Sequence, residues 1–332
     1  MMGRSVREGA GAAEVIRLFD DDAGTEAAIA SGYGFNFYSF AAPAGGRRHD
    51  FLFAEPGFPN PSLKATRNGT PILAPFPNRI AGGKYSFGGR DYSLALNEAG
   101  KNAIHGFAVD ARWRAEHDPA QAAVKGTFEL SRDRAERAAD WPSDFRLEIE
   151  YRLVGRRLTM AVAVFATGRG PLPFGFGIHP YFRFPLVDGG DAAACRIKVP
   201  AEKHVELDAC LPTGRTAPPE GDTDLRSFVS FAGKSFDDVY SGLVPDSDGV
   251  IRHELQDLAA GARLTVEHGP ELPYAVIYTA THRKAVCIEP YTCVTDAINH
   301  GTALADGTPT GWWELPPGTE RRFDIAFVVS DL

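Results

Sequence analysis

The chain of 332 residues is 44% hydrophobic and 23% charged, and it contains 35 glycines and 24 prolines. This composition is typical of a globular protein with many turns and excludes a disordered chain. The formal charge of −8 comes from 43 acidic and 35 basic residues, and no run of Lys and Arg forms a basic stripe, so we expect no nucleic-acid partner.

Targeting and redox signals are weak. The opening "MMGRSVREGAGAAEVIRLFDDDAG" lacks the continuous apolar segment of a secretory signal, and no apolar stretch is long enough to cross a bilayer. We therefore expect a cytoplasmic protein that does not contact membranes. The four cysteines contain no C-x-x-C pair, and we expect them to be reduced and mostly structural; they are Cys195, Cys210, Cys287 and Cys293.

Short apolar pieces separated by glycine and proline recur from residue 27 onward, a pattern typical of strands and turns. "GKYSFGGRDYSLAL" predicts a hairpin around Gly88 and Gly89. "RLEIEYRLVGRRLTMAVAVF" alternates charged and apolar residues on both sides of Val154 and Gly155, which predicts an antiparallel hairpin with one exposed face. Only "AEVIRLFDD" and "DRAERAAD" favour helix, and "TGRTAPPEGDTDLRS" favours a long surface loop.

The domain organisation follows from the evenness of this pattern. The chain shows no break in composition and no internal repeat. We expect one antiparallel β domain over residues 1–332, with about the first 12 residues loosely ordered.

Two early segments place polar side chains on tight turns. "PILAPFPNRIAGGKYSF" puts Asn78 and Arg79 after three prolines in seven residues. Arg79 could donate to ligand oxygens, and a surface ion pair is the alternative. "NEAGKNAIHGFAVDARW" puts His105 before Gly106, where the backbone can approach another element closely. His105 could bind a ligand or be a structural histidine.

The stretch "LPFGFGIHPYFRFP" surrounds His179 with aromatic residues. We expect the flanking aromatic side chains to keep the imidazole partly dry; they are Phe174, Phe176, Tyr181, Phe182 and Phe184. Burial disfavours the imidazolium and a nearby carboxylate favours it, so this site can hold a histidine whose pKa lies near neutrality. His179 is a candidate general acid, and a histidine that fills a polar niche in the core is the alternative.

Two later segments offer carboxylates. In "SFDDVYSG", Asp237 and Asp238 point to opposite faces of a strand, so only one of them can easily face a given pocket. In "AVCIEPYTCVTDAIN", Glu289 closes an apolar strand immediately before a proline, an unusual place for a charge without a partner or a task. Glu289 is the candidate general base, and a buried structural ion pair is the alternative.

Motifs for metals and cofactors are missing. The histidines and cysteines show no zinc spacing, and neither a phosphate-binding glycine loop nor a G-x-S-x-G elbow occurs. The candidate residues therefore predict acid–base chemistry without a metal or any other cofactor.

Taken in chain order, the segments closely resemble the aldose 1-epimerase (galactose mutarotase) family. The resemblance rests on "PFPNRIAGGKYSFGGRDYSLALNE", "NAIHGF" with a following tryptophan, "GFGIHPYF", "FDDVY", "IEPYTCVTDAIN" and "LPPGTERRFDIAF". It extends from about residue 13 to about residue 330, and its specificity lies in the ordered set. It implies an all-β fold, a large antiparallel β-sandwich of the galactose mutarotase-like supersandwich type, with a sugar cleft on its concave face.

The resemblance also implies an isomerase that interconverts the α and β anomers of a free monosaccharide by opening and closing the ring. It makes His179 the acid that protonates the ring oxygen and Glu289 the base that takes the proton from the anomeric hydroxyl. The remaining matches are substrate ligands, namely Asn78, Arg79, His105 and Asp237. A histidine and a carboxylate on opposite sides of the anomeric carbon would suffice for these two proton transfers.

Three alternatives remain. Hexose-6-phosphate mutarotases share the sandwich but typically have "HTYF" where this chain has "HPYF"; Arg112 or Arg183 in the cleft would favour this alternative, because a phosphate needs a cationic partner. A non-catalytic carbohydrate-binding protein would share the fold, although the presence of both His179 and Glu289 argues against it. A glycoside hydrolase would need a second carboxylate across from Glu289, for which Asp237 is the candidate.

Overall fold

Antiparallel strands make up most of the structure, a computed structural model that describes residues 3–186 and 190–332. The largest sheet has nine strands in the order β11-β12-β13-β14-β28-β24-β23-β18-β21. In chain order these strands are β11 (Arg114–His117), β12 (Ala123–Glu129), β13 (Phe145–Val154), β14 (Arg157–Ala166), β18 (Cys195–Lys198), β21 (Val229–Ser230), β23 (Ile251–Asp257), β24 (Ala262–His268) and β28 (Glu320–Asp331).

Two further sheets have five and eight strands. The five-stranded sheet runs in chain order through β1 (Arg4–Glu8), β2 (Val15–Asp20), β3 (Thr25–Ala30), β4 (Asn36–Ala44) and β5 (Arg47–Asp50). The eight-stranded sheet follows the order β20-β19-β22-β25-β26-β16-β6, and β17 pairs with β26. Its strands are β6 (Ile72–Leu73), β16 (Gly177–Ile178), β17 (Tyr181–Arg183), β19 (Ala201–Asp208), β20 (Leu211–Ala217), β22 (Asp237–Leu243), β25 (Tyr274–Thr279) and β26 (Ala285–Tyr291).

Short elements complete the described chain. Two-stranded sheets pair β7 (Arg79–Ile80) with β10 (Ala103–Ile104), β8 (Lys84–Phe87) with β9 (Arg90–Ser93), and β15 (Leu172–Phe174) with β27 (Trp313–Leu315). The helices are α1 (Leu130–Asp133), α2 (Ala297–His300) and the 3-10 turns η1 (Gly11–Ala13), η2 (Ala65–Arg67), η3 (Ala81–Gly83), η4 (Ala135–Asp140), η5 (Ala192–Ala194) and η6 (Gly221–Thr223). Among the described residues, no helix has the length and apolar character needed to cross a membrane.

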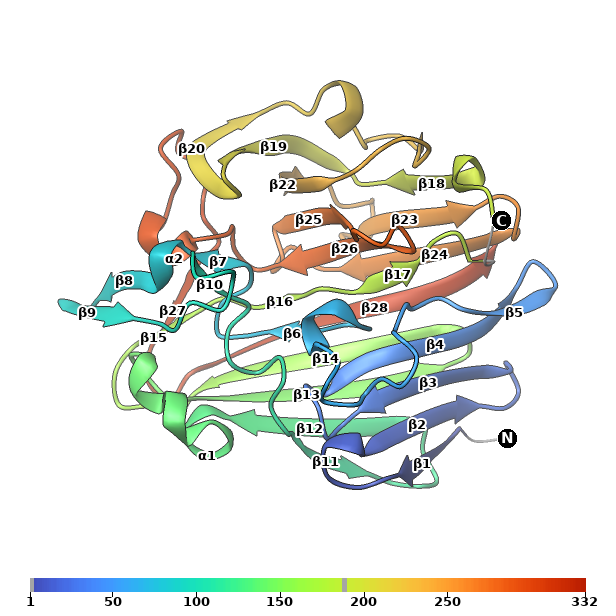
Figure 1. Cartoon of the computed structure of the whole chain (residues 1–332), viewed down its shortest axis with the longest axis horizontal. Coiled ribbons are helices and arrows are strands. Elements are labelled where there is room, and N and C mark those ends of the chain that lie inside the picture. Colours follow the sequence, from blue (N-terminus) through green and yellow to red (C-terminus); the bar gives the residue numbers. More distant parts are fainter. Residues whose placement is uncertain (1–2, 187–189) are drawn as a thin grey trace.

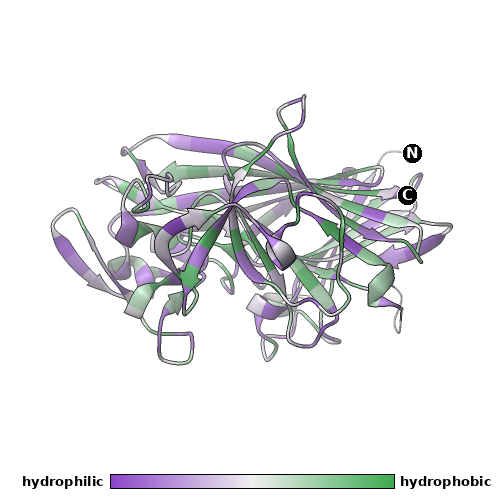
Figure 2. Cartoon of the chain, turned by 90° about the horizontal axis from the view of Figure 1, so that it is seen from above, coloured by the Kyte–Doolittle hydropathy of each residue, from purple (hydrophilic) through white to green (hydrophobic). Residues whose placement is uncertain are grey.

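The two smaller sheets cover the same face of the nine-stranded sheet. The ring of Phe327 in β28 contacts both Phe37 of β4 and Phe182 of β17, with ring centroids 5.4 and 6.1 Å apart. Figure 1 shows the five-stranded sheet in its lower part and the eight-stranded sheet in its upper part. In Figure 2 the strands carry hydrophobic and hydrophilic residues in alternation. The prediction of a large antiparallel β-sandwich is confirmed.

Both predicted hairpins are present. Gly88 and Gly89 connect β8 to β9 with positive φ angles of 57° and 75°, the backbone that a two-residue hairpin loop requires. In β13 every second side chain is buried and the others are partly or fully exposed, as the alternation predicts. The loop between β13 and β14 consists of Gly155 and Arg156, one residue later than predicted, because Val154 pairs with Arg157.

Two sequence expectations need correction, and the expectation that "DRAERAAD" is helical is confirmed. "AEVIRLFDD" is not a helix but contains β2, because pairing with β1 and β3 on both sides buries Ile16 and Leu18. "DRAERAAD" forms the end of α1 and the 3-10 turn η4. The first third of "TGRTAPPEGDTDLRS" lies in β20 and pairs with β19.

The start of the chain is more regular than expected. Residues 4–8, which we expected to be loosely ordered, form β1 and pair with β2. Residues 1–2 lie outside the described part of the chain.

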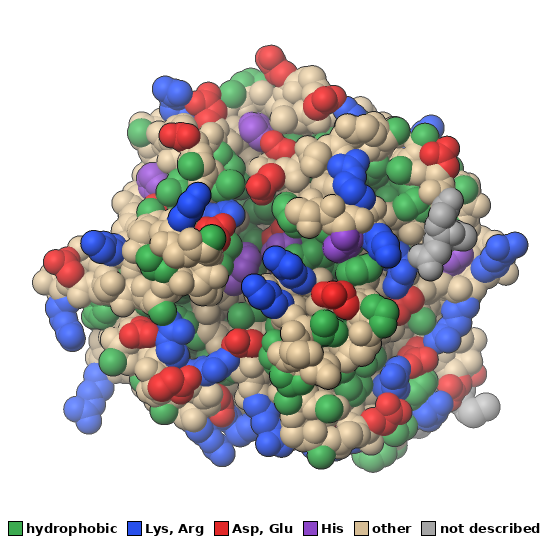
Figure 3. Space-filling view, in the orientation of Figure 1, with side chains coloured by type: hydrophobic (Ala, Val, Ile, Leu, Met, Phe, Trp, Pro, Cys, Tyr) green, Lys and Arg blue, Asp and Glu red, His purple; other side chains and the backbone are tan. Residues whose placement is uncertain are grey.

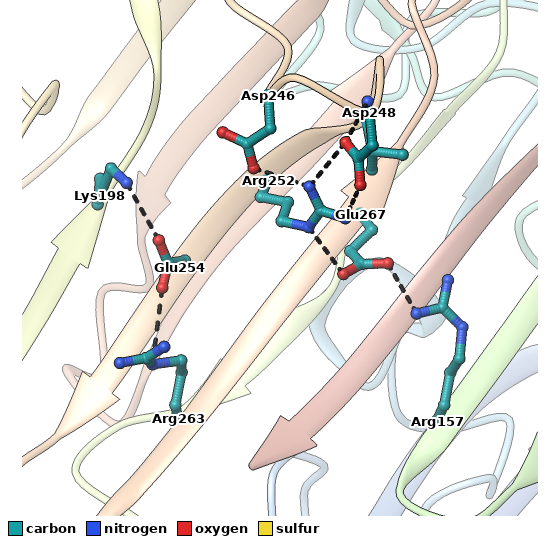
Figure 4. Close-up of polar contacts among 9 residues, drawn as sticks. Arg157, Lys198, Asp246, Asp248, Arg252, Glu254, Arg263 and Glu267 are labelled. Atoms are coloured by element: carbon teal, nitrogen blue, oxygen red, sulfur yellow. Dashed lines mark hydrogen bonds and ion pairs between the residues drawn. The ribbon is translucent and has the colours of Figure 1, made fainter. Parts of the chain in front are cut away.

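Ion pairs lie across the strands of the nine-stranded sheet (Figure 4). Arg252 and Glu267 face each other on β23 and β24, with Nε 3.1 Å from Oε1, and Arg157 of β14 donates to the other oxygen of Glu267. Glu254 lies between Lys198 and Arg263 in the same way. These four cations, namely Arg157, Lys198, Arg252 and Arg263, are therefore balanced by neighbouring carboxylates.

Candidate active site

The six residues predicted from the sequence line one pocket of about 270 Å³, near the lower end of the range for small-molecule sites. They come from five separate segments, and they are Asn78, Arg79, His105, His179, Asp237 and Glu289. Figure 3 shows histidine side chains in a hollow at the centre of this face of the molecule. The fold thus brings the candidates together, and their individual roles stay predictions.

Strand β26 supplies the floor of this pocket. Its residues alternate, so that Val286 and Ile288 join the main hydrophobic core while Glu289 faces the pocket. We expected Glu289 to end its strand, but β26 continues through Pro290 to Tyr291. Only 1% of Glu289 is exposed.

His179 and Glu289 contact each other directly. Nε2 of His179 lies 3.3 Å from Oε1 of Glu289, and 8% of His179 is exposed. The expectation that the two groups lie on opposite sides of the anomeric carbon stays a prediction. Adjacent groups can still reach both reacting oxygens, because the ring oxygen and the anomeric hydroxyl are bonded to the same carbon.

Burial decides which of these two side chains carries the proton. Burial lowers the pKa of His179 to about 3. We expected a pKa near neutrality, and this expectation is wrong. Burial also raises the pKa of Glu289 well above its ordinary value, against the lowering effect of a hydrogen bond from Tyr291. A neutral imidazole beside a protonated carboxyl group is therefore the favoured resting form. Moving one proton across the contact converts it to imidazolium and carboxylate.

Two tyrosines enclose the His179 ring. The ring of Tyr181 stacks on it with centroids 4.7 Å apart and planes 4° apart, and the edge contact with Tyr278 has centroids 5.8 Å apart. The neighbouring phenylalanines do not supply this enclosure. Phe176 contacts Phe323 and Phe182 contacts Phe327 within the sandwich instead.

Tyr291 holds the second oxygen of Glu289. Its hydroxyl donates a short hydrogen bond to Oε2, while Oε1 faces His179. The ring of Tyr291 lies against Gly177, where an added Cβ would be 2.3 Å from the ring. A glycine in β16 is thus needed to leave space for the tyrosine that orients the carboxylate.

The sequence allowed Arg79 to be either a ligand donor or a member of an ion pair, and the structure places it both in the pocket and in an ion pair. It lines the pocket, and its guanidinium donates to both oxygens of Glu98, with Nη2 2.6 Å from Oε1. Nη1 donates to Oδ1 of the neighbouring Asn78 at 2.9 Å. The hydrogen bond from Arg79 lowers the pKa of Glu98, although burial opposes the shift. Arg79 and Glu98 therefore form a fixed, charge-balanced wall.

His105 lies beside His179 at the end of a strained turn. The two rings meet edge to face with centroids 5.6 Å apart. His105 has a φ of 69°, and an added Cβ on Gly106 would lie 2.2 Å from the carbonyl oxygen of Ala74, so the predicted close backbone approach is confirmed. Burial, with the charges of His179 and Arg79, lowers the pKa of His105 well below its ordinary value. Its Nδ1 has no hydrogen-bond partner among the described residues.

Only one of the adjacent aspartates faces the pocket, as the alternation of a strand predicts. Asp237 lines the pocket, and burial raises its pKa. Asp238 is oriented elsewhere, and its Oδ1 lies 2.9 Å from Nε2 of His204.

One group of side chains could offer donor atoms to a metal ion. Donor atoms of His179, Cys287 and Glu289 lie within 4.8 Å of one another, a group that no spacing motif predicted. Burial raises the pKa of the Cys287 thiol well above its ordinary value, which opposes the thiolate that a metal ligand requires.

Several pocket residues were not predicted. Tyr291 could have been found, since it is two residues from Glu289 and must share its strand face. Lys64 and Arg67 lie in "LKATRNG", which carries no motif. Neither Arg112 nor Arg183, the cations considered from the sequence, is among the described residues that line this pocket.

Comparisons with known proteins agree with this architecture. The family model for aldose 1-epimerase matches residues 52–327. The uncharacterized protein YihR of Escherichia coli (strain K12) is 25% identical over 238 residues, which are 70% of this chain and 72% of that protein. A galactose mutarotase-like protein from Clostridium acetobutylicum superimposes with a TM-score of 0.86 at 24% identity, covering 99% and 98% of the two chains. Galactose 1-epimerase from Lactobacillus acidophilus gives a TM-score of 0.75 at 18% identity, with 99% and 98% covered.

Proposed function

The chain belongs to the aldose 1-epimerase family, and from this premise we propose that it interconverts the α and β anomers of an aldose whose anomeric hydroxyl is free. The substrate is a small sugar that fits the pocket of about 270 Å³. Because the pocket draws on segments from residue 64 to residue 291, we also propose that the whole chain acts as one domain.

The proposed reaction begins with the ion-pair form of the two buried groups. Protonated His179 donates to the ring oxygen, and Glu289 takes the proton of the anomeric hydroxyl. The C1–O5 bond breaks as the C1–O1 bond becomes a carbonyl, which gives the open-chain aldehyde. After rotation about C1–C2, the ring oxygen attacks the other face of C1, His179 recovers its proton, and Glu289 returns its proton to O1.

The resting proton distribution fits this cycle. Neutral His179 beside protonated Glu289 is the form that remains after ring opening and is ready for ring closure. Direct proton transfer over the 3.3 Å contact regenerates the ion pair that opens a cyclic sugar. Both halves of the reaction therefore use one proton that stays within the pair.

The remaining side chains bind and orient the sugar in this proposal. Neutral His105 offers a hydrogen bond beside His179, and Asp237 accepts from sugar hydroxyl groups across the pocket. Arg79 and Asn78 supply a rigid donor and acceptor wall, since Glu98 holds the guanidinium in one orientation.

The direct contact of His179 with Glu289 in a pocket lined by all six predicted residues is the observation that carries the proposal. The test is the decay of optical rotation of fresh α-D-glucose and α-D-galactose in weak buffer without added cofactor. We expect the protein to accelerate the decay. Rates equal to buffer alone on a panel of free aldoses would refute the function and favour a non-catalytic sugar-binding protein.

A further inference from the structure

Two cations at the rim of the pocket have no counter-ion within residues 3–186 and 190–332. Lys64 and Arg67 line the pocket and are exposed, and neither forms an ion pair or a side-chain hydrogen bond with any residue that the structure describes. This differs from the nine-stranded sheet, where Arg157, Arg252 and Lys198 are each matched by a carboxylate (Figure 4).

Two of the three acidic groups of the same pocket already have close partners. Glu98 accepts from Arg79, and Glu289 is held by Tyr291 and His179. Asp237 lies 3.7 Å from the thiol of Cys210 and forms no ion pair with a described residue. None of these three carboxylates forms an ion pair with Lys64 or Arg67 among the residues that the structure describes.

The backbone that carries the two cations is fixed. Arg67 ends the 3-10 turn η2 and Lys64 is the residue that precedes it, and the amide of Arg67 donates to the carbonyl of Lys64 at 3.1 Å. Both side chains line the same pocket. Beneath the turn, the buried Asn68 donates to the carbonyl of Lys64 at 2.9 Å, and the buried Asn36 donates to the carbonyl of Asn68 at 2.8 Å.

The turn is also tied to the proposed acid. The hydroxyl of Tyr181 donates to the carbonyl of Thr66 at 2.8 Å, between the two cations, while the ring of Tyr181 stacks on His179. The cations are therefore held at a defined place relative to the imidazole.

We propose that this pocket takes an aldose that carries an anionic substituent, bound by Lys64 and Arg67. The inference rests on the proposed function. The ring oxygen of an aldohexose is bonded to C1 and C5, and C5 carries the exocyclic carbon. If His179 protonates the ring oxygen, we place the turn that contacts Tyr181 on the C5 side of the sugar. A carboxylate or a phosphate on that carbon supplies the missing negative charge, and Arg67 offers a planar fork to either one.

A second hollow next to Arg67 supports this placement of the anionic substituent. It is about 470 Å³ in volume and meets the sugar pocket at Arg67, Tyr181 and Tyr278. Lys284 adds a further cation there, and Glu55 adds an opposing charge. The anionic group therefore belongs at the Arg67 end of the sugar pocket rather than deep in the second hollow, where Glu55 would repel it.

The experiment compares D-glucose, D-glucuronate and D-glucose 6-phosphate by anomer-exchange NMR at low ionic strength. The uncatalysed rate of each sugar in the same buffer is subtracted. We expect kcat/KM to be about tenfold higher for at least one anionic sugar than for D-glucose, as two partly exposed charge contacts would give. The glucuronate and phosphate arms distinguish the two kinds of anion.

Two double variants test whether Lys64 and Arg67 cause the preference for anionic sugars. The variant Lys64→Ala/Arg67→Ala should lose most of the preference, whereas Lys84→Ala/Arg47→Ala, which removes the same charge from exposed positions outside the pocket, should keep it. Equal turnover of neutral and anionic sugars, or a preference that survives the first double variant, would overturn the inference alone. Absence of turnover with every sugar would reject the proposed function instead, and this inference with it.

Discussion

Nε2 of His179 lies 3.3 Å from Oε1 of Glu289, on a strand and a neighbouring segment more than one hundred residues apart in the sequence. The contact joins the proposed acid and base into one unit that holds a single proton. Each group then depends on the other for its protonation state, so the two cannot be treated as independent catalysts.

Replacement of either member of this pair should remove most activity. We expect His179→Asn and Glu289→Gln each to lower kcat for a reactive aldose by about 10²-fold or more, since each loses one proton transfer. Anomer-exchange NMR measures the rate, and circular dichroism with thermal unfolding checks the fold. The control is His204→Asn, which breaks a histidine–aspartate contact outside the pocket and should keep its rate. Turnover near the wild-type value in either pocket variant would show that its assigned role is wrong.

Tyr291→Phe should change the pH dependence of the reaction. The hydrogen bond from Tyr291 stabilises the ionised carboxylate, so its loss raises the pKa of Glu289 further. In the resting pair the single proton lies on Glu289, so the alkaline limb of kcat/KM, where the pair loses this proton, should move to higher pH. The rate on the plateau should fall, because less of the ion-pair form is populated. The matched control, Tyr240→Phe, removes a buried hydroxyl that donates to the carbonyl of Thr223. An unmoved alkaline limb would mean that Tyr291 only fills space.

Gly106→Ala should destabilise the turn that carries His105. The new Cβ would lie 2.2 Å from the carbonyl oxygen of Ala74, and the residue would keep a φ of 69°. We expect a loss of about 2 kcal/mol or more in the free energy of unfolding, with a lower kcat. Gly88→Ala is the control, because it has a φ of 57° but no atom within 4 Å of its added Cβ. Equal losses in the two variants would assign the effect to backbone conformation alone.

Two buried histidines predict sensitivity to acid. Nδ1 of His268 donates to the carbonyl of Gly269 at 2.9 Å, so its Nε2 accepts from Nε2 of His253, also at 2.9 Å. Burial lowers the pKa of His268 from 6.5 to about 4 and that of His253 well below its ordinary value. The unfolded chain therefore binds more protons than the folded one in the window from about 6.5 down to about 4, and stability falls as pH falls.

From the shift of His268 alone, we expect about 2 kcal/mol less unfolding free energy near pH 5 than near pH 7. Urea titrations at the two pH values measure this difference. His253→Gln keeps a donor for His268 and removes one titrating group, so its loss on acidification should be smaller. The same loss in this variant would exclude the pair as the cause.

Removal of metal ions should leave the reaction intact. Both proton transfers use side chains of the pair, and burial keeps the Cys287 thiol protonated by raising its pKa. Dialysis against EDTA should therefore not change kcat. If EDTA abolished turnover and Zn²⁺ restored it, the group formed by His179, Cys287 and Glu289 would be a metal site.

Local patterns in the sequence were sufficient for the strand content and for the chemistry of single positions. The alternation in β13 and the two glycines between β8 and β9 follow from backbone and solvent preferences that act over a few residues. The same rule correctly separated Asp237 from Asp238. It failed at β2, because pairing with two neighbouring strands overrides a weak local preference for helix.

The sequence by itself determined which residue types were available for catalysis, through the ordered segments that contain Asn78, Arg79, His105, His179, Asp237 and Glu289. Only the tertiary structure decided that His179 and Glu289 contact each other and that burial shifts their pKa values in opposite directions. It also decided that Lys64 and Arg67 line the same pocket without an ion pair to any residue in the described part of the chain. The reason is physical: a distance, a degree of burial and a missing counter-ion depend on segments that are far apart in the chain and meet only when the sheets pack together.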